Sequence, residues 1–121
     1  MSNIQQLLTK IVASFALLTS TIVSGQNISL MGTVDCGMWL DARNKKIAIA
    51  LESYSVGYVN GLAVGSLIDI WTAKGATVSS AQLHFWLDEY CKKNPLSGIF
   101  EGVHTFADEM TSGRFSKAIK K

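Results

Sequence analysis

IAIALESYSVGYVNGLAVGSLIDIW, residues 47–71, is the stretch that decides the fold of this chain. Its pattern predicts one long helix over about residues 46–71. In such a helix Leu51 and Tyr58 lie on one face, while Val56 and Leu67 lie on the opposite face. A helix that is apolar all round is typically buried. We therefore expect this helix to be at the centre of the fold.

Shorter helices with one apolar face are predicted on either side of the long one. Their approximate ranges are 34–41, 80–94 and 95–111. The last is expected to begin at Asn94 and Pro95, because asparagine caps helices well and proline is favoured in the first turn. Its apolar stripe begins at Leu96. The sequence therefore predicts an all-α fold, a small helical bundle of about four helices wrapped on a central buried helix.

Two segments between and after these helices carry no helical pattern. Residues 72–76 contain Gly75 and are expected to form a loop, and the basic residues 114–121 are expected to form a frayed tail. Residues 43–46 are a basic cluster, which is usually a solvated surface connection.

The first 25 residues have the features of a secretory signal peptide. Lys10 is their only charge, residues 11–18 are mostly apolar, and small and polar residues lead to Gly25. This order matches the charged, hydrophobic and cleavage regions of such peptides. An uncleaved membrane anchor is the alternative, although the apolar run is shorter than the ~20 residues that span a bilayer. We expect residues 1–25 to be a signal peptide and residues 26–121 to be a single exported domain, periplasmic or secreted.

Cys36 and Cys91 are the only two cysteines. An exported chain enters an oxidising compartment, where a lone pair of cysteines favours a disulfide. Closing a loop of ~56 residues stabilises a fold by about 4 kcal/mol in the chain-entropy model. A domain this small often needs such a covalent cross-link to be stable. Two free buried thiols are the alternative if the chain is not exported.

The charge pattern and the histidines exclude several classes of function. The chain has 11 basic and nine acidic residues, and removing Lys10 leaves ten against nine. No basic stripe supports nucleic-acid binding. His84 with Asp88, and His104 with Asp108, have the one-turn spacing of metal ligands, but neither belongs to a recognised motif. We predict no enzyme activity, no metal and no cofactor.

Gly57, Gly61 and Gly65 align on one side of the long helix. Each interior glycine costs about 1 kcal/mol relative to alanine, so three in register indicate that something uses the space. One interpretation is close approach by a helix carrying Trp86 or Phe106; another is a groove for a partner. In a membrane this spacing is a dimerisation face. The longest uncharged run of this helix, residues 53–68, has only 16 residues, so no stable membrane span is predicted for the mature chain.

Phe85 is predicted to project from the polar side of its helix, beside Glu89. Aromatic residues are enriched at protein interfaces, whereas contact with the chain termini is the alternative. We therefore take Phe85 and Glu89 as candidate partner contacts. The further candidates for partner binding lie on the long helix and are Gly57, Tyr58, Gly61 and Gly65.

The order of these motifs resembles a known family. Gly57-Tyr58-x-x-Gly61, the segment 77–83, and Asn94-Pro95 follow one another as in the Tai-type immunity proteins of type VI secretion. Those are small helical periplasmic proteins that bind and block an incoming cell-wall amidase. The resemblance implies an exported immunity-like inhibitor of a cell-wall-targeting effector.

The plan of the chain is also similar to that of HdeA-like acid-stress chaperones. These are exported helical proteins with one disulfide, in which acid loosens a dimer and exposes apolar surface to unfolding clients. This resemblance implies a periplasmic chaperone whose partners are unfolding proteins, and it leaves a homodimer open. A third alternative is a membrane-associated helical protein built on the glycine face.

Overall fold

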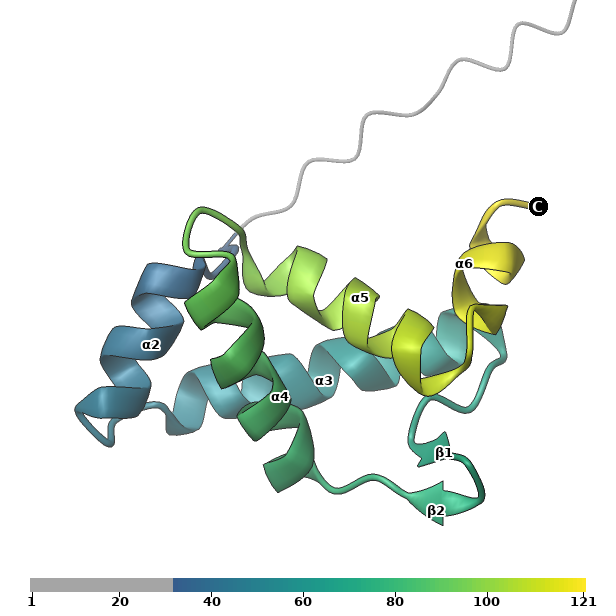
Figure 1. Cartoon of the computed structure of the whole chain (residues 1–121), viewed down its shortest axis with the longest axis horizontal. Coiled ribbons are helices and arrows are strands. Elements are labelled where there is room, and N and C mark those ends of the chain that lie inside the picture. Colours follow the sequence, from purple (N-terminus) through teal and green to yellow (C-terminus); the bar gives the residue numbers. More distant parts are fainter. Residues whose placement is uncertain (1–31) are drawn as a thin grey trace, which may run out of the picture.

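The computed structural model of this protein describes residues 32–121, and the predicted signal peptide lies outside the described residues. These residues form five helices and one two-stranded antiparallel hairpin (Figure 1). The helices are α2 (Cys36–Asn44), α3 (Ile49–Ser66), α4 (Ser80–Lys93), α5 (Ile99–Met110) and α6 (Arg114–Ile119), and the strands are β1 (Thr72–Ala73) and β2 (Ala76–Thr77). The predicted all-α small helical bundle is confirmed.

A covalent bond joins the first described helix to the third. Cys36 in α2 and Cys91 in α4 form a disulfide, and both side chains are fully buried. The predicted pairing is therefore confirmed. The start of α2 is also tied to the start of α5, because the Cys36 amide donates to the Ser97 carbonyl and the Ile99 amide donates to the Val34 carbonyl.

The hydrophobic core lies among α2, α4, α5 and α6, with α3 against one side. Helices α4 and α5 approach closely at Gly102, where an added Cβ would lie 3.0 Å from side-chain atoms of Leu87 and Tyr90. The glycine that allows two helices to pack closely is thus in α5. The largest fully buried side chains include Trp39, Phe106, Phe115, Ile70, Leu83, Leu87 and Ile99.

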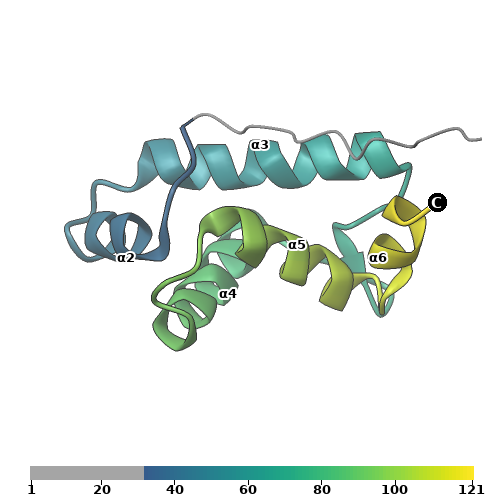
Figure 2. The same cartoon turned by 90° about the horizontal axis from the view of Figure 1, so that it is seen from above.

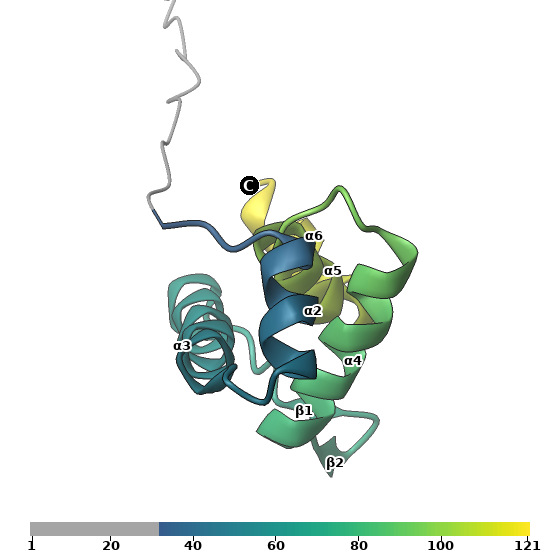
Figure 3. The ribbon, with the colours of Figure 1, turned by 90° about the vertical axis from the view of Figure 1, so that its left-hand side faces the viewer.

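The long helix exists, but the prediction that it is central and buried is wrong. Helix α3 runs along one edge of the molecule, and the other helices lie on one side of it (Figures 2 and 3). Only Ser55 and Val59 of its residues are buried, while Ile49 and Val64 are more than 70% exposed. Apolar residues all round a helix do not ensure burial, and here the outward side is small and uncharged.

The last part of the chain also corrects two expectations. Helix α5 begins at Ile99 rather than at Pro95, because the Gly98 amide donates to the Glu101 carboxylate at 2.9 Å and closes the first turn there. Residue 95 lies in the preceding turn. Leu96, expected in the apolar stripe of this helix, is fully exposed.

The segments expected to be a loop and a frayed tail are both ordered elements. Residues 72–77 form the β1–β2 hairpin, in which Gly75 takes the positive φ of +80° that its turn requires. The tail forms α6, whose Phe115 side chain is buried in the core. The Ser116 amide donates to the Asp108 carboxylate at 3.0 Å, which fastens the first turn of α6 to α5.

No helix among residues 32–121 is long and apolar enough to cross a membrane.

Removing the disulfide tests how much it contributes to the stability of the fold. The disulfide closes a long loop, because its two cysteines are 55 positions apart in the sequence. We therefore expect the double variant Cys36→Ala, Cys91→Ala to lose about 4 kcal/mol of unfolding free energy. Urea denaturation followed by circular dichroism measures the loss. Adding a reductant should lower the stability of the wild type in the same way and leave the variant unchanged. Equal stability of wild type and variant would contradict this account.

Candidate protein-binding site

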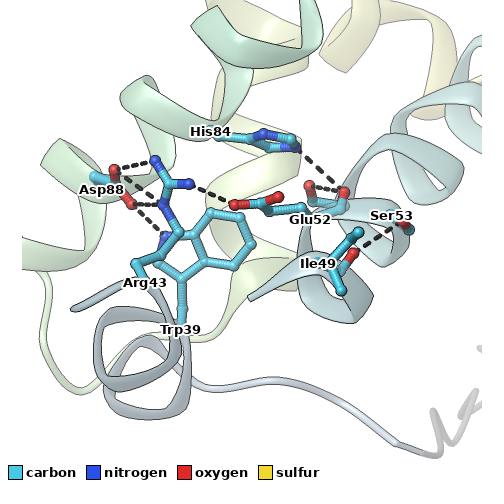
Figure 4. A network of polar contacts seen from close by, with 8 residues as sticks. Trp39, Arg43, Ile49, Glu52, Ser53, His84 and Asp88 are labelled. Atoms are coloured by element: carbon cyan, nitrogen blue, oxygen red, sulfur yellow. Dashed lines mark hydrogen bonds and ion pairs between the residues drawn. The ribbon is translucent and has the colours of Figure 1, made fainter. Parts of the chain in front are cut away.

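A polar network fixes the orientation of α4 (Figure 4). The Asp88 carboxylate in α4 accepts hydrogen bonds from Trp39 Nε1 at 2.8 Å, Arg43 Nη2 at 2.8 Å and Arg43 Nε at 3.0 Å. Arg43 Nη1 pairs with Glu52 in α3. His84 Nε2 lies 3.3 Å from the Glu52 carbonyl oxygen. The network therefore connects α2, α3 and α4.

Arg43 is the central member of this network, with its side chain only 29% exposed. The hydrogen bond to Asp88 raises the pKa of the guanidinium above its usual value. The guanidinium also lies 5.9 Å from the centre of the Trp39 ring, which is within reach of a cation–π contact. Sequence reasoning assigned Arg43 to a solvated connection, because nothing in a local pattern pairs it with a residue 45 positions later.

The same orientation of α4 places Phe85 and Glu89 on the outside. Leu83, Leu87 and Cys91 are buried, so the opposite side of the helix faces solvent. Phe85 is 66% exposed. Glu89 forms an ion pair with Lys92, with 2.7 Å between Oε1 and Nζ. The structure thus brings these two predicted residues together.

Phe85 borders a hollow of about 450 Å³ on the surface of α4. A second hollow of about 270 Å³ lies under the hairpin, and the two share Gln82 and Trp86. We call this continuous region the Phe85 surface. It comprises Ala73, Ala76, Thr77, Val78, Ala81, Gln82, Phe85, Trp86, Glu89, Phe106 and Met110.

Trp86 is the fixed wall between the two hollows. Its ring stacks on Tyr90 with 5.4 Å between centroids and meets the edge of Phe106 at 5.5 Å. Its indole Nε1 donates to the Glu109 carboxylate at 3.1 Å. Contacts with both α4 and α5 hold this side chain in place, so the hollows are formed before any partner arrives.

The other predicted candidates lie elsewhere. Gly57, Gly61 and Gly65 are exposed, and nothing lies within 4 Å of a Cβ added at any of them. The interpretation that Trp86 or Phe106 packs closely against these glycines is therefore wrong. Both aromatic side chains instead pack with each other between α4 and α5.

Tyr58 lies against α5 in a cluster of rings, away from the exposed glycines. Its hydroxyl is 3.0 Å from His104 Nε2 and forms a hydrogen bond with it. His104 also lies against Phe100 and Phe115, at centroid distances of 4.5 and 5.5 Å. Burial raises the pKa of Tyr58 to about 12 and lowers the pKa of His104. His104 is therefore packed among rings between α3, α5 and α6.

No three histidine, cysteine or acidic side chains within the described part of the chain are close enough together to hold a metal ion. No protein-family model, curated protein or solved structure matches the chain. The resemblances to Tai-type immunity proteins and to HdeA-like chaperones therefore stay predictions, and the functional argument depends on the Phe85 surface.

Replacing Asp88 tests the polar network. We expect Asp88→Ala to lower the unfolding free energy by about 2–3 kcal/mol, because Arg43 and the Trp39 indole lose their partner in a half-buried site. The matched control is Glu89→Ala, which removes an exposed carboxylate from the adjacent position and should change stability by about 0.5 kcal/mol or less. Equal effects of the two substitutions, measured by urea denaturation, would refute the structural role of the network.

His104 should make stability depend on pH. Its pKa in the folded protein is below 6.5, whereas in the unfolded chain it is near 6.5. The unfolded chain therefore binds more protons as the pH falls through about 6.5, and the folded state loses stability there. The unfolding free energy is measured at one pH above and one pH below about 6.5. Between these two pH values it should fall less for His104→Gln than for wild type. If both lose the same amount, His104 is not responsible.

Proposed function

We propose that this is an exported protein-binding protein, acting in the periplasm or a secreted location as an immunity-like inhibitor of a cell-wall-targeting effector. The Phe85 surface is the observation that carries the proposal. It combines a largely exposed aromatic ring with two apolar hollows, and Gln82 and Glu89 give it polar groups at the edge. Interfaces with strong central anchors have this composition.

The Phe85 surface is held rigidly by contacts within the bundle, which supports recognition of a folded partner. The disulfide and the Asp88 network both attach α4 to α2, and Trp86 is fixed by ring contacts. A preformed surface loses little conformational freedom on binding, which favours affinity. An inhibitor needs no catalytic group of its own, because covering the active site of its target is sufficient.

The type of partner is inferred from the sequence. Gly57-Tyr58-x-x-Gly61 and the segment 77–83, which leads from β2 into α4, carry the resemblance to the Tai-type proteins. Part of that segment lies on the Phe85 surface, namely Thr77, Val78, Ala81 and Gln82. The proposal therefore places the target, a cell-wall hydrolase, against β2 and the first two turns of α4.

An acid-stress chaperone is the second candidate, and the Asp88 network favours it. In strong acid the carboxylates of a protein take up protons and lose their charge. Arg43 is then left half-buried without an anionic partner, which costs free energy. Loss of these contacts would release α4 from α3 and expose apolar surface to unfolding clients, while the disulfide keeps α4 attached to α2.

Capture experiments at two pH values separate the candidates. The oxidised protein is used as bait in periplasmic and secreted fractions at pH 7 and at pH 3, and bound proteins are identified by mass spectrometry. An inhibitor should bind one hydrolase stoichiometrically at pH 7 and block its activity. A chaperone should bind many proteins only in acid. Absence of a hydrolase at pH 7 would contradict the inhibitor.

Phe85→Asp tests which surface binds the captured hydrolase. We expect the dissociation constant to rise by about 30-fold or more, because a central aromatic anchor contributes about 2 kcal/mol or more to binding. Leu96→Asp is the matched control, since Leu96 is a fully exposed apolar residue outside the Phe85 surface. Biolayer interferometry measures both. Unchanged binding by Phe85→Asp would place the contact on another surface.

A further inference from the structure

The side of α3 that points away from the bundle is exposed, partly apolar and uncharged. Ile49 is 77% exposed and Val64 is 75% exposed. The outward side of a surface helix normally carries charged residues, and none is present here. We call this side the outer face of α3. Its residues, all exposed, are Ile49, Ala50, Ser53, Gly57, Asn60, Gly61, Val64 and Gly65.

We propose that the outer faces of α3 from two copies of this chain pack against each other in antiparallel orientation, with Gly57 at the crossing point. A two-fold axis through Gly57 places Ser53 of one copy opposite Gly61 of the other. It also places Ala50 opposite Val64. The larger side chain thus meets a small residue at each of these positions, which is the self-complementarity that a two-fold interface requires.

Charges at the two ends of α3 favour the antiparallel orientation. Lys46 precedes the helix by three residues and Asp69 follows it by three residues. Antiparallel pairing brings Lys46 of each copy near Asp69 of the other, whereas parallel pairing would bring Lys46 near Lys46. Both residues are exposed, and within residues 32–121 neither takes part in an ion pair. Opposed helix dipoles add to the same preference.

The glycines of α3 are explained by this packing. Each glycine destabilises the isolated helix relative to alanine, and no contact within the described chain uses the space at Gly57 or Gly61. Small residues let two helix backbones approach closely. A groove of about 460 Å³ adjoins the outer face between α3 and α4, with Gly57, Asn60 and His84 among its lining residues. Side chains of the second copy can enter it.

The expected dimer is weak. A helix of 18 residues is about 27 Å long and about 10 Å wide, so the contact covers about 300 Å² of each copy. That is well below the area of a standard stable interface. We therefore expect the dimer to form only at high protein concentration.

Sedimentation velocity over about 5–500 μM protein tests the dimer. Wild type should shift from monomer to dimer, and Val64→Glu should stay monomeric because it places charge in the contact. Leu96→Glu is the matched control and should dimerise like wild type. Gly57→Ala should raise thermal stability and yet weaken dimerisation, since a methyl group favours the helix but obstructs the crossing. A wild-type monomer at every concentration would overturn the proposal.

Cross-linking tests the orientation. A mixture of Ala50→Cys and Val64→Cys proteins should form an intermolecular disulfide, because their Cα atoms come within bonding reach only in the antiparallel dimer. Ala50→Cys alone should not cross-link. The reverse pattern would overturn the antiparallel arrangement. The inference is independent of the proposed function, since Val64→Glu should leave hydrolase binding by the Phe85 surface unchanged.

Discussion

The covalent attachment of α2 to α4 is the constraint on which the rest of the structure depends. Cys36 and Cys91 are fully buried members of the core, and α2 brings Trp39 and Arg43 to Asp88 one turn before the disulfide on α4. The bond and the network together determine which side of α4 is buried. The exposure of Phe85 on the other side follows from these contacts, and the proposed binding surface depends on it.

The features that the sequence predicts well are those with a local cause. The capping box at Ser79 and Gln82 marks the start of α4. The pairing of Cys36 with Cys91 is predicted because the chain has only two cysteines and is expected to enter an oxidising compartment. The exposure of Phe85 follows from helical periodicity. For the same reason, two of the six candidate binding residues, Phe85 and Glu89, were placed together correctly.

The features that the sequence does not predict depend on contacts between distant segments. The burial of Phe115 fixes α6, and no local pattern distinguishes this ring from one in a frayed tail. Arg43 reaches Asp88 across 45 positions. The apolar composition of α3 was interpreted as burial, although small uncharged residues on an exposed side give the same composition. A missing charge on a surface helix is better evidence for a partner.

Two surfaces with different properties thus lie on one small bundle, and a different role is proposed for each. The Phe85 surface has a large aromatic ring and preformed hollows, as expected for a tight contact with a folded partner. The outer face of α3 is uncharged and carries mostly small residues, as expected for weak self-association. Because the two surfaces belong to different helices, a dimer formed through α3 would leave both Phe85 surfaces free for partners.

The measurement that most directly tests the central claim is hydroxyl-radical footprinting of the oxidised protein, alone and bound to the captured hydrolase. It reports the solvent exposure of individual side chains in the intact complex. The account predicts that Phe85 is modified in the free protein and protected in the complex, while the exposed Met38 on α2 is modified equally in both. Continued modification of Phe85 in the complex would contradict the account.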